Sequence, residues 1–306
     1  STTRTGATAT PSCDYMGRFN AGWRDSMPEV FQKGTLYLCP TPIGNLEDIT
    51  YRTVRCLREA DLIAAEDTRH TKQLLMAYDI DTPLTSYHEH NKAEKGPQLI
   101  EKLKDGLMIA LVSDAGMPAI CDPGSDMVRL ALEANLPIVP LPGANAGLTG
   151  LIASGMDTTR FTFIGFLPKT QKHRLPVLES VKTYEGTLIF YEAPHRIQQV
   201  LGEMIEVLGD RKAVLCRELT KRYEQYLRGS LSKLRADLSE QRTRGEFVIL
   251  VEGAAAVERA ASGDVDYASL VRELMEQGVD KKEAIRTVAR RCGVPKRSVY
   301  QAALSL

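Results

Sequence analysis

The sequence predicts an α/β protein made of two α/β domains, the first with a mainly parallel sheet and the second with a mixed sheet. A small C-terminal helical segment follows them. Short apolar runs alternate with amphipathic helical patterns, and this alternation is typical of parallel strands joined by helices. Four of the runs end in polar loops rich in Gly and Pro. Since ligands bind at the carboxyl ends of strands in open α/β sheets, we expect a site in a cleft between the domains.

The first domain is expected over residues 34–154, where apolar runs and helical periodicities alternate. Its predicted strands cover 35–39, 61–65, 84–87, 108–112 and 138–141. Its predicted helices cover 51–59, 68–76, 92–104 and 125–135. The loops after the first, second, fourth and fifth strands are the four polar loops.

The second domain is expected over residues 155–253. Its predicted strands cover 161–166, 187–191, 213–216, 223–227 and 247–251. Too few residues separate 213–216 from 223–227 for a crossover helix, so this pair should be antiparallel. An Ala/Gly/Ser-rich linker is predicted over 254–266, and residues 1–33, rich in Ser, Thr, Gly and Arg, are predicted to be a disordered extension.

Composition narrows the class of protein. The 306 residues carry 39 Lys and Arg against 39 Asp and Glu, so any nucleic-acid-binding surface must be local. No apolar run approaches the ~18 residues of a membrane span, so no membrane contact is expected. The closest two of the six cysteines, Cys39 and Cys56, are 17 positions apart, so neither a zinc motif nor a disulfide framework is expected, and reduced thiols in a cytoplasmic protein are predicted.

The first polar loop, 39–46, argues against a nucleotide-phosphate ligand. Phosphate-binding loops need glycines and free backbone N–H donors. This loop has one glycine and two prolines, and each proline removes a donor. In the third loop, Asp114 lies beside the small residues Ala115 and Gly116, which allow a ligand to approach the backbone. Asp114 could bind a hydroxyl or a cation, or it could cap a helix.

Several motifs resemble those of the ribosomal RNA small subunit methyltransferase I family, a branch of the tetrapyrrole-methylase-like enzymes. The motifs, in chain order, are Pro-Thr-Pro-Ile-Gly-Asn-Leu at 40–46, Ala-Ala-Glu-Asp-Thr-Arg-His-Thr at 64–71, Leu-Val-Ser-Asp-Ala-Gly at 111–116 with Asp-Pro-Gly at 122–124, Phe-Tyr-Glu-Ala-Pro-His-Arg at 190–196, Arg-Glu-Leu-Thr-Lys at 217–221 and Gly-Glu-Phe-Val-Ile-Leu-Val-Glu-Gly at 245–253. The resemblance implies methyl transfer from S-adenosylmethionine to the ribose 2′-hydroxyl of a cytidine in the decoding region of 16S ribosomal RNA. It also implies a homodimer and no metal.

The resemblance further implies which residues bind S-adenosylmethionine. They are Pro42, Ser113, Asp114, Ala115, Gly116, Ile120, Pro142, Gly143 and Tyr191. Core packing would explain Ile120 and Tyr191 equally well.

Two polar clusters are candidates for catalysis. A 2′-hydroxyl needs a positioned base to accept its proton. Asp67 or His70 could be that base while Arg69 holds a phosphate, although the same residues could simply cap a helix at 68–76. Glu192 and His195 form the second cluster, whose alternative role is to open a helix.

Basic residues gather in a few segments that could contact phosphate or simply be solvated. Lys169, Lys172, His173 and Arg174 form one such segment, and Arg217 with Lys221 and Arg222 forms another. Residues 267–306 are predicted to be a basic helix-turn-helix-like tail, with seven Lys and Arg and one Glu from residue 281 onward.

Two other functions remain open at this stage. The first is C-methylation of a porphyrin-like ring, but ring methylases usually carry Gly-Pro-Gly in the first loop and Gly-Asp-Pro in the third. This chain has Thr-Pro-Ile-Gly at 41–44 and Ser-Asp-Ala-Gly at 113–116. The second is a DNA-binding regulator, which would leave most of the chain without a role.

Overall fold

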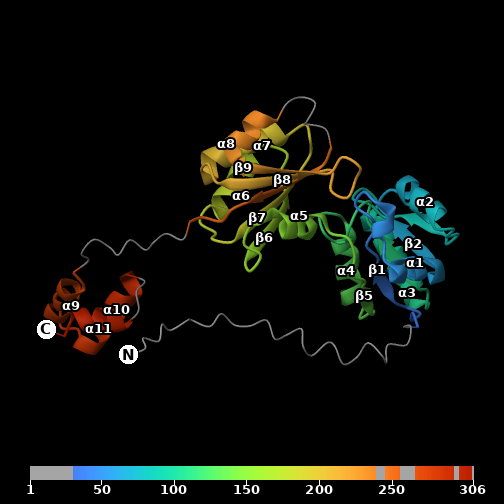
Figure 1. The fold of residues 1–306 in the computed structure, drawn as a ribbon. Coiled ribbons are helices and arrows are strands. Elements are labelled where there is room, and N and C mark those ends of the chain that lie inside the picture. Colours follow the sequence, from blue (N-terminus) through green and yellow to red (C-terminus); the bar gives the residue numbers. More distant parts are fainter. Residues whose placement is uncertain (1–29, 239–244, 256–265, 293–295, 305–306) are drawn as a thin grey trace, which may run out of the picture. The chain divides into compact units, whose positions relative to one another are not determined.

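The computed structural model describes residues 30–238, 245–255, 266–292 and 296–304. The chain divides into two compact units, which are described separately below. The first unit holds both α/β sheets and extends to Val181, then from Thr187 to Glu252 (Figure 1). The second contains Lys182–Gly186 and the C-terminal helices.

The first sheet is entirely parallel, in the order β3-β2-β4-β1-β5. Its strands are β1 (Leu36–Leu38), β2 (Leu62–Ala65), β3 (Leu84–Ser86), β4 (Ile109–Val112) and β5 (Ile138–Pro140). A 3₁₀ turn, η2, and four helices connect them: η2 (Leu46–Asp48), α1 (Tyr51–Glu59), α2 (Thr68–Ala77), α3 (Lys92–Lys104) and α4 (Gly124–Glu133). The predicted elements of this domain are confirmed to within a few residues.

Both faces of the first sheet are covered, because neighbouring strand residues point in opposite directions. In β4, Ala110 and Val112 pack in a core with Cys56 and Leu57 of α1. The alternate residues of β4 belong to a second core, whose helical members come from α3 and α4: Leu99, Ile100, Leu103, Met127 and Ala131. Burial on both faces explains why the strands are continuously apolar.

The second sheet is mixed, in the order β6-β7-β10-β8-β9. Its strands are β6 (Phe161–Phe166), β7 (Thr187–Glu192), β8 (Lys212–Arg217), β9 (Gln225–Ser230) and β10 (Phe247–Val251). Among the described strands of this sheet, only β6 and β7 pair in parallel, and β8 and β9 form the predicted antiparallel pair. Strand β9, the second of this pair, was predicted at 223–227 but begins at Gln225, because Tyr223 lies in the preceding turn. The helices are α5 (Ala146–Ser154), α6 (Gln171–Val181), α7 (Ile197–Leu208) and α8 (Leu231–Asp237).

Two observations bear on the predicted boundaries of the first domain. Helix α5, which the prediction placed in that domain, packs on the second sheet: Leu151 shares a core with Ile189, Val214 and Leu250. At the other end, Phe31 is buried against the edge of the Tyr37 ring at 5.1 Å, although it lies within the predicted extension. The rest of that extension, residues 1–29, lies outside the described residues, as do 256–265 of the predicted linker.

The C-terminal helices form a small core of their own. They are α9 (Tyr267–Glu276), α10 (Lys281–Cys292) and α11 (Lys296–Ala302). The core contains Val271, Ala284, Ile285, Val288, Ala289, Val299 and Ala303. A helix-turn-helix-like pair was expected from residue 281, and α9 adds a third helix to it. Among the described residues, no helix is both long and apolar enough to span a bilayer.

Candidate functional site

The loops that follow β1 and β4 are joined to each other at the carboxyl edge of the first sheet. Thr41 and Gly116 exchange two backbone hydrogen bonds of 2.9 and 3.1 Å, and the Thr41 hydroxyl donates to the carbonyl of Ser113 at 3.1 Å. Gly116 has φ 81°, and a Cβ atom there would lie 3.3 Å from Ile43. A glycine is therefore needed at this position, which fixes the two loops as one wall of a site.

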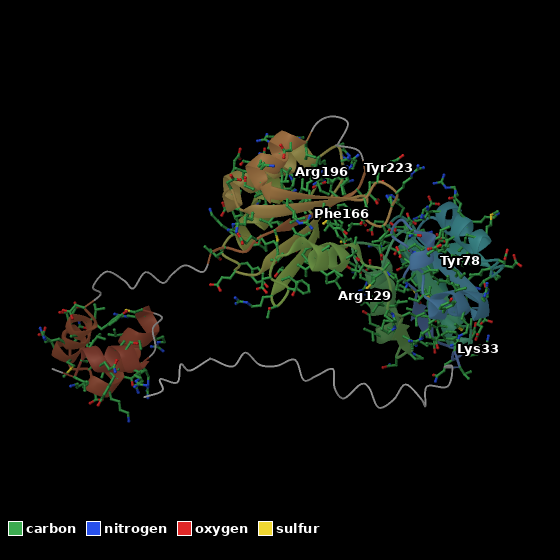
Figure 2. The ribbon with its side chains drawn as sticks, in the orientation of Figure 1. Lys33, Tyr78, Arg129, Phe166, Arg196 and Tyr223 are labelled. Carbon is green, nitrogen blue, oxygen red and sulfur yellow. The ribbon has the colours of Figure 1, made fainter. Side chains whose placement is uncertain are left out.

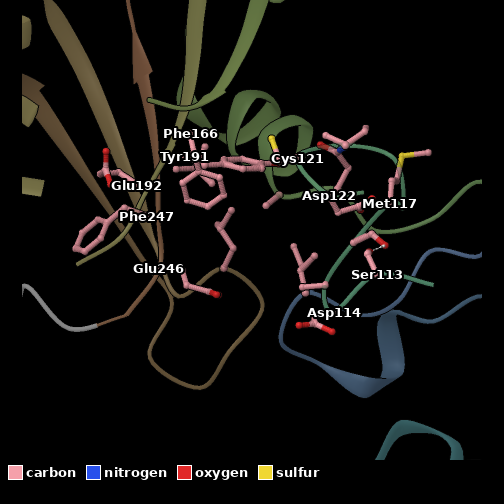
Figure 3. A pocket seen from close by; sticks show the side chains of 18 of the residues that line it. Ser113, Asp114, Met117, Cys121, Asp122, Phe166, Tyr191, Glu192, Glu246 and Phe247 are labelled. Carbon is pink, nitrogen blue, oxygen red and sulfur yellow. Dashed lines mark hydrogen bonds between the residues drawn. The ribbon is translucent and has the colours of Figure 1, made fainter. Parts of the chain in front are cut away.

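A pocket of about 420 Å³ opens between this wall and the second sheet, a size suited to a small organic ligand. Figure 3 shows Ser113, Asp114 and Asp122 on one side, with Tyr191, Glu192 and Phe247 on the opposite side. We call it the first pocket. It confirms the expected cleft between two α/β domains.

Most of the residues expected to bind the co-substrate meet in the first pocket. Its lining includes Ser113, Asp114, Ala115, Gly116, Ile120 and Tyr191. Pro42 instead lines a second, neighbouring pocket. Pro142 and Gly143 are exposed and line neither pocket. A Cβ at Gly143 would lie 2.5 Å from that of Pro40, so this glycine lets the fifth strand's loop pack on the first loop.

Tyr191 is held in place by contacts from helix α5 and from strand β6. Its hydroxyl accepts a hydrogen bond of 2.9 Å from the backbone N–H of Gly147 in α5. The rings of Phe163 and Phe166 meet it edge-on at centroid distances of 5.0 and 5.6 Å, and Figure 2 locates Phe166 on the second sheet. Burial raises the pKa of the Tyr191 hydroxyl. The side chain is thus a fixed, neutral wall of the pocket.

Three carboxylates on the first-domain side of the pocket lack a cationic partner among the described residues. They are Glu66, Asp114 and Asp122, which we call the carboxylate triad. One oxygen of Asp114 accepts from the backbone N–H of Asp67 at 3.0 Å, and the backbone N–H of Asp114 donates to Glu66. Burial, then repulsion from Asp114 and Asp122, raises the pKa of Glu66.

One of the two carboxylate oxygens of Asp122 accepts hydrogen bonds from backbone N–H groups. Its Oδ1 accepts from the backbone N–H groups of Ala119 and Gly124 at 2.9 and 2.7 Å, while the buried Oδ2 has no hydrogen-bond partner in the part of the chain that the structure describes. Burial, and secondarily the charge of Asp114, raises its pKa. Ala119 and Cys121 both have positive φ, 69° and 63°, so this loop stores backbone strain next to the pocket.

The carboxylates on the second-domain side do have cationic partners. Glu192 is 1% exposed and pairs with Arg196 at 3.1 Å. Burial raises the pKa of Glu192 despite that partner. Glu246 pairs with Lys221 at 3.2 Å. His195, which sequence analysis grouped with Glu192, is exposed and lines neither pocket.

The second pocket, of about 520 Å³, lies alongside the first and shares Ser113, Asp114 and Ala115 with it. Asp67 and His70 of the second loop line it, as does Lys221. Unlike the first pocket, it therefore contains basic side chains. Such a pocket suits an anionic or polar partner.

Asp67 is the N-cap of α2, and both of its carboxylate oxygens interact with Arg69. Its Oδ1 accepts from the Arg69 backbone N–H at 2.8 Å, and its Oδ2 pairs with the Arg69 guanidinium at 2.9 Å. These bonds lower the pKa of Asp67 to about 2. A carboxylate of such low pKa is a weak base, so among the two candidate bases the geometry favours His70. Arg69 itself is 90% exposed and lines neither pocket.

Arg174, a candidate phosphate contact in the sequence, is unsuited to that role. Its side chain is 3% exposed and forms two bonds of 2.6 Å to Glu203. Its Nη1 also donates to the carbonyl of Lys169 at 2.6 Å. The sequence could not reveal this pairing, because Glu203 lies 29 positions away on another helix.

Sequence reasoning missed several residues that line the first pocket. The acidic ones are Glu66, Asp122 and Glu246, and the others include Asn145, Ala146, Phe166, Leu219 and Phe247. A signal existed for two of them, since Glu66 directly follows β2 and Asp122 opens the Asp-Pro-Gly motif. The aromatic and apolar members carried no such signal.

The first pocket fits a cationic ligand. Among the described residues, its lining includes five carboxylates and no Lys, Arg or His. A buried, unpartnered carboxylate oxygen is costly unless a positive charge lies near it. S-adenosylmethionine carries a sulfonium and an ammonium, and it has no phosphate. The donor set of the pocket therefore suits this molecule and does not suit a nucleotide phosphate.

Comparison with known proteins gives the class of the protein and then its group. Residues 35–235 match the family described as Tetrapyrrole (Corrin/Porphyrin) Methylases. The chain belongs to this family of methyltransferases and, within it, to the ribosomal RNA small subunit methyltransferase I group. It is 52% identical over 273 residues to Ribosomal RNA small subunit methyltransferase I of Halalkalibacterium halodurans, covering 88% of this chain and 94% of that protein. The protein of the same name from Bacillus subtilis is 48% identical, with the same coverage.

Solved structures with the same fold are more distant in sequence. A conserved hypothetical protein from Aeropyrum pernix has a TM-score of 0.59 and 16% identity, covering 89% of this chain and 96% of its own. The cobalamin biosynthetic enzyme cobalt precorrin-4 methyltransferase has a TM-score of 0.56 and 16% identity, and the match covers 72% of this chain and 95% of that enzyme's chain. At these identities the likeness concerns the fold alone.

Proposed function

We propose that the protein transfers a methyl group from S-adenosylmethionine to the ribose 2′-hydroxyl of a cytidine in the decoding region of 16S ribosomal RNA. The observation that carries this proposal is the acidic first pocket beside a second pocket with basic residues, in a chain of this group. Incubation with labelled S-adenosylmethionine and hypomethylated small ribosomal subunits tests it. Label mapping to a cytidine ribose is the expected result, and label on the base, on protein or on no component would contradict it.

The two pockets bind different reactants. Ser113, Asp114 and the other lining residues named above hold the co-substrate in the first pocket, where it supplies an electrophilic methyl group. The second pocket receives the target nucleotide, and His70 accepts the proton of the 2′-hydroxyl. Arg69, exposed next to this pocket, binds a phosphate that flanks the target ribose. Holding the hydroxyl oxygen in line with the methyl group supplies much of the rate enhancement.

Asp114→Ala is expected to weaken S-adenosylmethionine binding by about 1–3 kcal/mol, the cost of losing a hydrogen bond to a charged group. Calorimetry on the folded variant measures it. Asp114→Asn separates the hydrogen bond from the charge, because its amide oxygen can still accept from the Asp67 backbone N–H while the negative charge is lost. Unchanged affinity in the Ala variant would remove Asp114 from the binding site.

The C-terminal unit supplies a basic surface for the RNA. Along α10 and α11 the exposed side chains include Lys282, Arg286, Arg290, Arg291, Lys296 and Arg297. Tyr300 is 53% exposed on α11 and could stack on a base. We propose that these helices dock on ribosomal RNA, because the chain has no net charge as a whole while seven Lys and Arg against one Glu are concentrated from residue 281 onward.

Deletion of residues 267–306 is expected to raise the apparent KM for small subunits and to flatten its salt dependence, because fewer phosphate contacts release fewer counterions. Co-substrate affinity should not change, since the residues named as lining both pockets belong to the first unit. Methylation kinetics at several salt concentrations measure both effects. Wild-type kinetics at every salt concentration would show that the segment has another role.

Two alternatives are weaker. Methylation of a porphyrin-like ring has in its favour the family description and the 16%-identical precorrin enzyme, whereas relatives at 44–52% identity are named for ribosomal RNA. A DNA-binding regulator would use only the C-terminal unit. We further propose a homodimer that acts in the cytoplasm, where small subunits are assembled; light scattering of the purified protein tests the dimer.

A further inference from the structure

The acidic residues of the first pocket fall into two groups that differ in how their charge is balanced. Glu192 and Glu246 pair with Arg196 and Lys221. The carboxylate triad has no Lys, Arg or His within ion-pair distance among the described residues. The fold therefore accumulates negative charge on one wall of the pocket.

This charge is unfavourable for the ligand-free protein. Burial and mutual repulsion raise the pKa of both Glu66 and Asp122. The Oδ2 atom of Asp122 is buried, and no donor among the described residues forms a hydrogen bond to it. Folding stability alone would not favour this arrangement, since replacing such groups by apolar ones is often neutral or stabilising. A cation in the pocket would relieve the repulsion.

We propose that the carboxylate triad is the counter-charge for the sulfonium, and that it makes the pocket favour S-adenosylmethionine over the product S-adenosylhomocysteine. This inference rests on the proposed function. In the reaction the ribose oxygen forms a bond to the methyl carbon, the carbon–sulfur electron pair returns to sulfur, and the hydroxyl proton passes to the base. The sulfur becomes a neutral thioether, so the triad loses its cation and the product is bound more weakly.

The test compares three ligands on isosteric variants. Asp122→Asn and Glu66→Gln remove a charge, and each amide oxygen can still accept the backbone hydrogen bonds of the original carboxylate. We expect the Kd for S-adenosylmethionine to rise about tenfold in each variant, while that for S-adenosylhomocysteine changes less than about twofold. Sinefungin, which has an ammonium in place of the methylated sulfur, should behave like S-adenosylmethionine. Glu133→Gln, at an exposed carboxylate outside both pockets, is the matched control.

Proton release gives a second readout that does not depend on the variants. A cation stabilises the ionised forms of Glu66 and Asp122, whose pKa values are raised, so S-adenosylmethionine binding near those pKa values should release protons and should weaken as the pH falls through them. Calorimetry in buffers of different ionisation enthalpy measures this release. S-adenosylhomocysteine should release fewer protons.

Each outcome has a distinct meaning. Equal losses of affinity for all three ligands would overturn the inference and give the triad a structural role. Unchanged affinities would also overturn it, as would binding of S-adenosylmethionine that requires added Mg²⁺. A wild-type protein that binds neither S-adenosylmethionine nor S-adenosylhomocysteine would instead contradict the proposed function itself.

Discussion

Glu203→Ala is expected to lower the free energy of unfolding by about 3–5 kcal/mol, because it leaves a buried guanidinium without its partner. Arg174 and Glu203 are 3% and 4% exposed and share two bonds of 2.6 Å. Arg174 also holds the carbonyl of Lys169, so the loss should reach the loop that follows β6. Urea unfolding measures the change.

Two controls separate burial from charge pairing. Glu133→Ala removes an exposed partner of Arg129 and should leave the free energy of unfolding nearly unchanged. Figure 2 shows Arg129 on the first domain. The double variant Arg174→Met with Glu203→Leu should recover most of the lost stability, since no buried charge remains. A loss under about 1 kcal/mol for Glu203→Ala would show that the guanidinium finds other partners.

The same pair predicts a pH dependence. The hydrogen bonds and charge of Arg174 lower the pKa of Glu203 in the folded protein. The stabilisation is therefore present above the ordinary carboxyl pKa, and it is lost as the pH falls through the lower folded value. The free energy of unfolding of the wild type should fall more steeply in acid than that of the Arg174→Met, Glu203→Leu variant.

His70→Gln is expected to slow methyl transfer about 10²–10⁴-fold, the range for loss of a general base. His70 lines the second pocket and not the first, so S-adenosylmethionine affinity should be unchanged. Single-turnover methylation of hypomethylated subunits, with calorimetry of co-substrate binding, measures the two quantities separately.

Asp67→Asn is the control for this prediction. Asn is as good an N-cap as Asp, so α2 should remain intact. If Asp67 only caps α2 and holds Arg69, this variant should retain far more activity than His70→Gln. The reverse order would make Asp67 the base, despite a pKa of about 2 in the absence of RNA.

The sequence determined the elements of the fold and the edge at which the site lies. Local periodicity predicts helices and strands, and the carboxyl ends of parallel strands must meet at one edge. The loops carrying Ser113, Asp114 and Gly116 were found in this way, and six of the nine residues expected to bind the co-substrate line the first pocket. Motifs in the right order also predicted the family.

Only the tertiary structure decided how each charge is balanced. Glu66, Asp114 and Asp122 look alike in the sequence, as do Glu192 and Glu246, yet among the described residues only the second group has cationic partners. The sequence makes Arg174 a candidate for binding phosphate, but the tertiary structure buries it against Glu203.

The physical reason is the same in each case. The pKa and partners of an ionisable group depend on burial and on side chains that are distant in sequence, such as Arg174 and Glu203, which are 29 positions apart. Helical and strand periodicities depend on neighbours a few positions away, so the sequence by itself records them. The chain's own pattern thus sets where its pockets form, and long-range packing sets which charges in them remain free for a ligand.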